Sequence, residues 1–327
     1  MFKPVSDSYR VEAVEIPGKM LAGNPLRDPV VRHAAVVLPT QTLVPSHPTL
    51  IYWLPGFGGS SEDILRDASA WSGLVGKLAE KLGPTILVAI DGRNRWGGSQ
   101  YIDSTAQGRY GKYVCEEIVP LIEQRFGGPK TAARRVIAGH SSGGFGALRL
   151  GMRYPTLFGS IVAMSPDSDF PTTHRSIVED PSVHKISLAT VDALMTPDPA
   201  KCPKIAGEGP YVAALSAAYA PVGLRAPGRF QWPIGADGRV DERVWRRWLD
   251  NDPLELVRRN PHAFTPMQSI YLDGGATDEF KANIGARKIY EVLKPRKSRS
   301  TFYESPGGHG AHYFERIQRG VFWALGV

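Results

Sequence analysis

Short apolar runs alternate with longer helical patterns from about residue 49 onward in this chain of 327 residues. The runs contain β-branched and other apolar residues without polar alternation, which is typical of strands buried on both faces of a parallel sheet. The expected strands are Thr49–Leu54, Thr85–Ile90, Arg135–Ala138, Ser160–Met164, Ser269–Leu272 and Thr301–Glu304. The expected helices cover residues 62–82, 108–126, 142–153, 278–293 and 312–324. This alternation predicts an α/β fold with one main, mostly parallel sheet flanked by helices.

Two parts of the chain depart from this alternation. Before residue 49, Tyr9–Ile16 and Val30–Leu38 have the pattern of two antiparallel strands at an edge of the sheet. Residues 167–266 hold 12 of the 27 prolines and show no convincing strand. A connection of this length is normally a lid or a binding insertion, and the alternative is a helical elaboration that packs on the core. We therefore expect a core of residues 1–166 and 267–327 and an inserted lid of residues 167–266.

Three of the seven tryptophans, Trp232, Trp245 and Trp248, lie in this insertion. Helical spacing puts Trp245, Trp248 and Leu249 on one face. Such a face forms the core of a lid more often than the wall of a ligand site, and both roles can hold at once. Because a proline-rich path and large apolar side chains suit a semi-rigid apolar wall, we expect the three tryptophans to contact substrate and to influence acyl-chain preference.

Composition excludes several classes of protein. Hydrophobic residues make up 42% and charged residues 22%, which excludes a disordered chain. The formal net charge of +7 is small for this length, so no nucleic-acid partner is expected. Cys115 and Cys202 are too few for a disulfide scaffold.

No run approaches the roughly 18 apolar residues that a membrane span requires, so no membrane association is expected. The first ten residues lack the apolar segment of a signal peptide. We therefore expect a cytoplasmic protein, although a chain whose leader has been removed would look the same. The sequence does not indicate an oligomeric state.

The sequence Gly-His-Ser-Ser-Gly occupies residues 139–143 and contains the pattern Gly-x-Ser-x-Gly. An apolar strand leads directly into it and an amphipathic helix follows it, as in the nucleophile elbow of serine hydrolases. Such a turn presents the Ser141 hydroxyl at a helix N-terminus, where amide groups favour the negative charge of acyl transfer. The alternative is a serine that only caps the helix in a glycine-rich turn.

A serine hydroxyl needs a base and an orienting acid to act as a nucleophile. In enzymes with this elbow, the acid and then the histidine follow the serine in the chain. Asp278 lies after the strand that begins at Ser269, and Asp273 is the competing acid. His309 lies on a glycine-flanked loop after the last strand and is preferred over His312 as the base. His140, the neighbour of Ser141, is expected to point away from the site.

A buried strand also leads into the glycine-rich loop Pro55–Ser60. This is the position of the second oxyanion donor in such enzymes, so we expect the N–H groups of Phe57 and Ser142 to hold the oxyanion. The loop lacks Gly-Lys-Ser/Thr and does not fully match Gly-x-Gly-x-x-Gly, so a nucleotide site is not expected. No histidine or cysteine cluster has zinc spacing, and neither a metal nor a cofactor is implied.

Together these motifs resemble the putative-esterase family of α/β-hydrolases, which includes S-formylglutathione hydrolases, enterochelin esterases, feruloyl esterases and mycolyltransferases. The matching segments, beginning near residue 21 and continuing to the C-terminus, are 21–26, 53–59, 89–93, 97–101, the turn at Ser141, 275–280 and 307–309. The resemblance implies an α/β-hydrolase fold. It places the nucleophile, acid and base on Ser141, Asp278 and His309, and the oxyanion donors on Phe57 and Ser142.

The resemblance says less about the substrate. Gln100 and Tyr101 line the site by their position in the family, and a structural role in the loop is an equal alternative. Pro55 stands where many members have histidine or aspartate, and the insertion matches the family poorly, so the acyl pocket does not transfer. We expect a serine hydrolase that cleaves a small-molecule carboxylic ester through an acyl-enzyme. The alternatives are an acyltransferase that uses an alcohol acceptor and, more distantly, a non-catalytic binding protein on the same fold.

Overall fold

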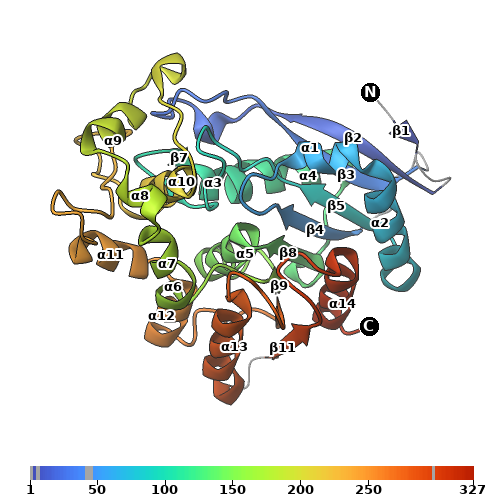
Figure 1. The fold of residues 1–327 in the computed structure, drawn as a ribbon. Coiled ribbons are helices and arrows are strands. Elements are labelled where there is room, and N and C mark those ends of the chain that lie inside the picture. Colours follow the sequence, from blue (N-terminus) through green and yellow to red (C-terminus); the bar gives the residue numbers. More distant parts are fainter. Residues whose placement is uncertain (1–2, 5–7, 41–46, 297–298) are drawn as a thin grey trace.

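A computed structural model describes residues 3–4, 8–40, 47–296 and 299–327, and its centre is a twisted sheet of nine strands (Figure 1). The strand order is β1-β2-β3-β5-β4-β8-β9-β10-β11. The six strands from β5 to β11 in this order are parallel, and β1, β2 and β3 extend the sheet in antiparallel pairs. The strands are β1 Lys3–Pro4, β2 Tyr9–Ile16, β3 Arg32–Pro39, β4 Thr49–Leu54, β5 Thr85–Ala89, β8 Arg135–His140, β9 Ser160–Met164, β10 Ser269–Gly275 and β11 Ser300–Ser305, with the small ribbon β6 Asp103–Ser104 and β7 Gly108–Arg109 outside the sheet.

The predicted α/β fold is confirmed, and all six expected parallel strands are present. The β4 strand shows why their sequences are apolar throughout. Leu50, Tyr52 and Leu54 pack into the hydrophobic cluster on one face of the sheet, and Ile51 and Trp53 pack into the cluster on the other. Since both faces are covered, no position on the strand favours a polar side chain.

Helices cover both faces of the sheet (Figure 1). One face packs against α1, α2 and α14, and the other packs against η2, α4, α5, α12 and α13. The α-helices are α1 Ser61–Arg66, α2 Ala68–Leu82, α3 Tyr110–Lys112, α4 Val119–Phe126, α5 Ser142–Arg153, α6 Phe170–Thr173, α7 Arg175–Val178, α8 Pro181–His184, α9 Leu188–Leu194, α10 Gly209–Tyr219, α11 Glu242–Leu249, α12 Pro253–Arg259, α13 Ala282–Leu293 and α14 Tyr313–Leu325. The other helical turns are η1 Lys19–Leu21, η2 Tyr113–Ile118, η3 Ala132–Arg134, η4 Pro199–Lys201 and η5 Lys294–Arg296.

The expected helices differ from the observed ones mainly at their ends. The pattern over 62–82 divides at Asp67 into α1 and α2. The pattern over 278–293 becomes helical only at Ala282, because Asp278 lies in a turn whose N–H groups its own side chain binds. None of the helices within the described ranges has the length and apolar character needed to cross a membrane.

The insertion folds into short helices, α6 to α12, most of which lie at the side of the molecule opposite the chain termini (Figure 1). It has a hydrophobic cluster of its own, built largely on α10, α11 and the three tryptophans. Phe145 of α5 belongs to the same cluster and joins the insertion to the core. The last helix of the insertion packs differently, since Leu254 and Val257 of α12 lie in the core cluster on the face of the sheet that α5 and α13 cover. The boundary between insertion and core at residue 266 remains a prediction. The apolar packing changes from the cluster of the insertion to the cluster of the core earlier, at α12.

The Trp248 side chain is fully buried, so its replacement should destabilise the protein. We expect Trp248→Ala to lower the free energy of unfolding by about 3–5 kcal/mol, because a large cavity is left where the ring packed. Urea unfolding followed by circular dichroism measures the change. Leu224→Ala is the matched control, because Leu224 is 85% exposed. A Trp248→Ala protein as stable as this control would contradict the buried position of the ring.

Candidate active site

The turn between β8 and α5 places Ser141 at the carboxyl end of the sheet. Its backbone has φ of 57° and ψ of −123°, a conformation that residues other than glycine adopt only under strain. The Ser141 carbonyl accepts a hydrogen bond from the N–H of Phe145, but the side chain makes no capping hydrogen bond to α5. Ser141 therefore lies on a strained turn between a strand and a helix, and its side chain does not cap that helix.

Two glycines allow this turn to form. A Cβ atom on Gly143 would lie 1.8 Å from the carbonyl oxygen of Leu54, and one on Gly139 would lie 2.3 Å from that of Gly143. Side chains at these positions would collide with backbone that cannot move away. Glycine therefore lets α5 begin directly against the ends of β4 and β8.

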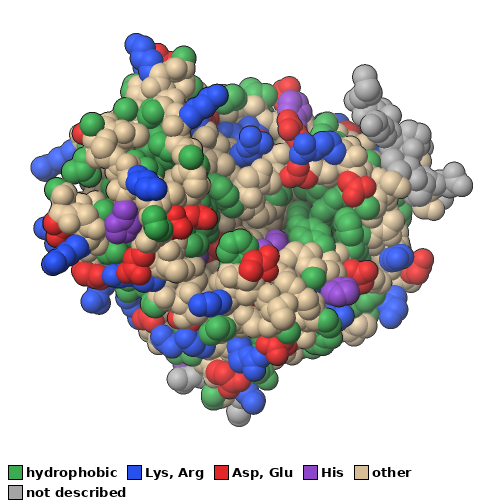
Figure 2. All heavy atoms as spheres, in the orientation of Figure 1, with side chains coloured by type: hydrophobic (Ala, Val, Ile, Leu, Met, Phe, Trp, Pro, Cys, Tyr) green, Lys and Arg blue, Asp and Glu red, His purple; other side chains and the backbone are tan. Residues whose placement is uncertain are grey.

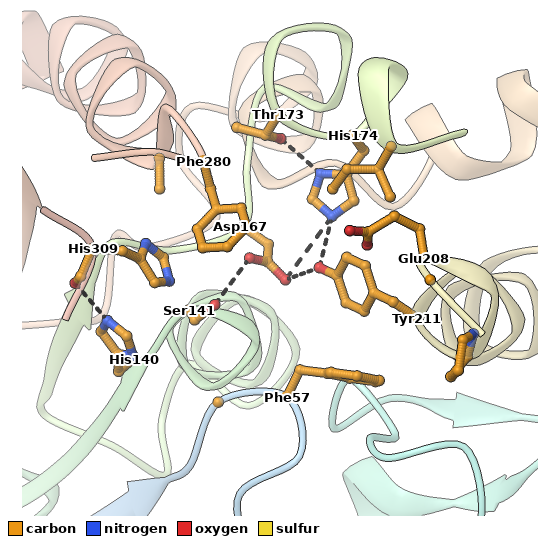
Figure 3. Close-up of a pocket in the computed structure, with 15 residues that line it drawn as sticks. Phe57, His140, Ser141, Asp167, Thr173, His174, Glu208, Tyr211, Phe280 and His309 are labelled. Atoms are coloured by element: carbon orange, nitrogen blue, oxygen red, sulfur yellow. Dashed lines mark hydrogen bonds and ion pairs between the residues drawn. The ribbon is translucent and has the colours of Figure 1, made fainter. Parts of the chain in front are cut away.

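Ser141 lies in a cavity of about 470 Å³ between the core and the insertion (Figure 3). The face that contains the hollow between these two parts is drawn in Figure 2. Eight of the fifteen residues that line the cavity come from the insertion, which therefore forms one side of it. The lining residues are Gly56, Phe57, His140, Ser141, Asp167, Thr173, His174, Ile177, Gly207, Glu208, Pro210, Tyr211, Phe280, Ala282 and His309.

His309 and Asp278 meet beside this cavity. The Nδ1 atom of His309 lies 2.9 Å from Oδ2 of Asp278, and the Asp278 Oδ1 atom accepts the N–H of Phe280 at 3.0 Å. Burial acts to raise the pKa of Asp278, but the hydrogen bond and the charge of His309 outweigh it and hold this pKa below its ordinary value. The side chain is thus kept as a carboxylate that fixes the orientation of the imidazole.

Hydrogen bonds to the carbonyl oxygen of His309 hold the loop that carries this residue. His140, which we expected to point away, lines the cavity instead, and its Nε2 atom lies 2.9 Å from the His309 carbonyl oxygen. Arg316 of α14 donates to the same oxygen at 2.8 Å. Burial, with a smaller effect of the nearby His309, lowers the pKa of His140 to about 3, so its ring is neutral at ordinary pH.

The two competing candidates lie outside the cavity. Asp273 is fully buried and forms an ion pair with Arg316 at 2.7 Å. Burial raises the pKa of Asp273, and Arg316 opposes this effect. The exposed His312 occupies the N-cap position of α14 and does not line the cavity. The structure brings Ser141, Asp278 and His309 to one place and leaves Asp273 and His312 apart from it.

Phe57 and Ser142 provide backbone N–H groups on either side of Ser141. Phe57 lines the cavity, and Ser142 is the first residue of α5. Neither N–H has an acceptor among the described residues, so both are able to bind a ligand oxygen. The Phe57 ring also packs edge-on against Tyr211 of the insertion, with centroids 4.7 Å apart.

The remaining predicted substrate contacts are not in the lining of the cavity. Gln100 and Tyr101 are buried next to the Pro55–Ser60 loop, where the Tyr101 hydroxyl donates to the Pro55 carbonyl at 2.7 Å. The tryptophans of the insertion are buried in its hydrophobic cluster, so the side chains expected to form an apolar wall belong to the core of the insertion. The three residues are Trp232, Trp245 and Trp248.

The sequence analysis missed a polar network that the insertion brings to Ser141. Asp167 Oδ1 lies 3.5 Å from the Ser141 Oγ, and Oδ2 accepts the hydroxyls of Ser142 at 2.8 Å and Tyr211 at 3.0 Å. His174 Nε2 is 3.1 Å from the Tyr211 hydroxyl. One signal was available, because Asp167 follows the expected strand Ser160–Met164 and ligand sites lie at the carboxyl ends of parallel strands. His174 and Tyr211 had no comparable signal.

The described residues contain no group of three or more His, Cys, Asp or Glu side chains arranged to hold a metal ion. The site instead combines a serine on a strained turn, a histidine–carboxylate pair and free backbone N–H groups. These features define the class of serine hydrolases with an α/β-hydrolase fold.

Comparison with known proteins agrees with this class. The model of the family described as "Putative esterase" matches residues 31–323, and the chain therefore belongs to that family. As a member of this family, it is a carboxylic ester hydrolase. No curated protein matches it by sequence.

Solved structures of serine hydrolases share the fold. The S-formylglutathione hydrolase of Agrobacterium tumefaciens is 17% identical with a TM-score of 0.63, and the match covers 100% of this chain and 98% of that one. The fluorophosphonate-binding serine hydrolase FphF of Staphylococcus aureus is 14% identical with a TM-score of 0.62, covering 97% and 99%. A ferulic acid esterase is 17% identical with a TM-score of 0.60, covering 98% and 97%.

The close approach at Gly143 predicts opposite outcomes for two glycine substitutions. Gly143→Ala should destabilise the protein and weaken labelling of the chain by a fluorophosphonate, because α5 must move away from Leu54. Gly73→Ala is the matched control. Gly73 is exposed in α2 with nothing near its added Cβ, so this change should stabilise the helix by up to about 1 kcal/mol. Equal urea midpoints for the two variants would contradict the packing described here.

Proposed function

We propose that this protein hydrolyses a small-molecule carboxylic ester through a Ser141–His309–Asp278 triad and an acyl-enzyme. The observation that carries the proposal is the 2.9 Å contact between His309 and Asp278 beside the cavity that contains Ser141. Membership of an esterase family supports the same reaction.

The reaction begins at Ser141. Because Nδ1 of His309 faces Asp278, Nε2 is the nitrogen that takes the proton of the serine hydroxyl. The Ser141 Oγ attacks the ester carbonyl carbon, and the carbonyl electrons move to oxygen. The N–H groups of Phe57 and Ser142 donate to this oxyanion, which forms next to the N-terminus of α5.

The tetrahedral intermediate then collapses. The bond to the alcohol breaks, and the alcohol leaves with the proton held by Nε2 of His309. Water enters, gives a proton to the same nitrogen and attacks the acyl carbon. The bond to Oγ then breaks, Oγ takes the proton back from Nε2, and the carboxylic acid leaves free Ser141 behind. Asp278 keeps its negative charge throughout and stabilises the imidazolium at each step, in agreement with its lowered pKa.

Loss of either the nucleophile or the base should abolish this chemistry. Ser141→Ala and His309→Ala should each lower kcat on a p-nitrophenyl ester by on the order of 10⁶-fold, because triad residues act as a unit. The exposed His312 supplies the matched control. His312→Ala should keep kcat within about twofold of the wild type. A larger loss in His312→Ala than in His309→Ala would show that the base has been assigned to the wrong histidine.

The pH profile provides an independent test. Burial lowers the pKa values of His140 and His174, so both rings stay neutral at ordinary pH. The range in which histidines ordinarily change their protonation is about pH 5 to 8. The base accepts a proton only when it is neutral, so kcat/KM should rise with pH through this range along a limb of unit slope. A rate that falls over this range would exclude a neutral histidine base.

Removal of divalent metal ions should not affect the reaction, because the proposed mechanism activates its nucleophile with a histidine alone. We expect the same kcat/KM before and after dialysis against EDTA. Inactivation by EDTA that is reversed by a divalent ion would indicate a metal-activated water as nucleophile.

A further inference from the structure

Asp167 places a buried carboxylate against the proposed nucleophile. The residue is 7% exposed, and its Oδ1 atom lies 3.5 Å from the Ser141 hydroxyl. The other oxygen, Oδ2, accepts from the hydroxyls of Ser142 and Tyr211 and, at 3.4 Å, from the side-chain amide of Gln100. Each of these partner groups is able to donate a hydrogen bond, as an ionised carboxylate requires.

None of the described groups around Asp167 is a cation. Its hydrogen-bond donors are neutral hydroxyl and amide groups. The His174 ring lies beside it, with Nε2 4.0 Å from Oδ2, and burial lowers the pKa of this histidine. A buried carboxylate normally has a cationic partner. Because the described hydrogen-bond donors to Asp167 are all neutral, they leave its negative charge uncompensated.

The cavity as a whole has the same sign. Its described lining contains the carboxylates of Asp167 and Glu208 and no lysine or arginine, although the chain has a formal net charge of +7. Figure 3 shows the Glu208 side chain directed to the same part of the cavity as Tyr211 and His174. The local charge favours a substrate that carries a positive charge.

The position of Asp167 indicates which part of the substrate carries the positive charge. A carboxylate this close to Ser141 repels the oxyanion that forms during attack, and a substrate cation bound to the carboxylate reduces this repulsion. In an acyl-enzyme, a substituent on the α-carbon is three bonds from Oγ. Because these bonds are each about 1.5 Å long, the substituent lies within about 4 Å of Oγ and reaches Asp167 Oδ1.

We propose that the cavity is specific for esters whose acyl part carries an ammonium group on the α-carbon, and that Asp167 binds this group. The ammonium donates to Oδ1 of Asp167, which holds the acyl carbonyl against Ser141 and cancels the charge that opposes the oxyanion. Glu208 strengthens the negative field at the same end of the cavity. The inference rests on the proposed ester hydrolysis at Ser141.

Two esters of nearly equal size test it. Glycine ethyl ester has an ammonium group where ethyl propanoate has a methyl group, and acid release at pH 6.5 is followed for both. At this pH an α-amino group, whose ordinary pKa is about 7.7–8.0, is mostly protonated. The ratio of the two kcat/KM values cancels the protonation state of the enzyme. We expect the wild type to prefer glycine ethyl ester by at least about tenfold, a preference of the size that one desolvated ion pair provides.

Variants then assign the preference. Asp167→Asn should lower the ratio by at least about tenfold, since the amide keeps the shape of the carboxylate without its charge. The partly exposed Glu208 makes no side-chain hydrogen bond to the described residues, so Glu208→Gln should fold normally and lower the ratio by less. Asp237→Asn, the same change at an exposed loop residue, is the control and should leave the ratio unchanged. If Asp167→Asn does not fold, the wild-type ratio and Glu208→Gln decide the question.

The remaining outcomes separate the inference from the proposed function. Equal rates on the two esters, or an Asp167→Asn ratio equal to that of the wild type, would overturn the ammonium site while leaving ester hydrolysis intact. Failure of a fluorophosphonate to label Ser141, with no cleavage of either ester, would overturn the proposed function itself. Acetylcholine and its uncharged analogue 3,3-dimethylbutyl acetate form a further pair. An Asp167-dependent preference for acetylcholine over this analogue, with none for glycine ethyl ester, would place the cation on the alcohol part and overturn the assignment to the acyl part.

Discussion

The buried ion pair between Asp273 and Arg316 joins several elements at the carboxyl end of the sheet. Both side chains are fully buried, and taking two charges out of water is costly unless further hydrogen bonds satisfy them. Here Arg316 also donates to the Ser165 hydroxyl after β9 and to the carbonyl oxygen of His309. One guanidinium thus joins β10, α14, the end of β9 and the loop of the proposed base. The position of His309 follows from this buried cluster more than from its own flexible, glycine-flanked sequence.

Much of the fold could be predicted because burial on both faces leaves a clear record in a strand. The apolar runs at Thr49–Leu54 and Ser160–Met164 have the same bounds in the structure as in the sequence analysis. The ends of β8 and β10 were missed, since they finish in Gly139-His140 and in Asp273-Gly274-Gly275. These polar and glycine residues pair as strand residues although their intrinsic propensity is against strands. They lie where strand pairing ends next to the site, and natural proteins depart from local propensity at such positions.

The residues of the candidate site could be predicted only where their order along the chain, relative to the expected strands, indicates their position in the fold. Ser141, Asp278 and His309 could be chosen because an elbow and two later strand ends define where a partner can come from. The role of His140 could not, since the side chain of a residue next to the turn is directed by its packing against Tyr313 and His309. The tryptophans of the insertion were placed incorrectly for a related reason. A short amphipathic helix shows that one face is buried, but its sequence does not show whether it faces a ligand or another helix.

The two ends of the insertion are held together next to the cavity. Asp252, which precedes α12, accepts the N–H groups of Asp169 at 2.9 Å and Phe170 at 2.7 Å and is fully buried. This contact closes a loop of more than 80 residues next to the segment that carries Asp167 and His174. Since Asp252 lies on the part of the insertion that packs beneath the sheet, the sheet fixes Asp167 through a short connection.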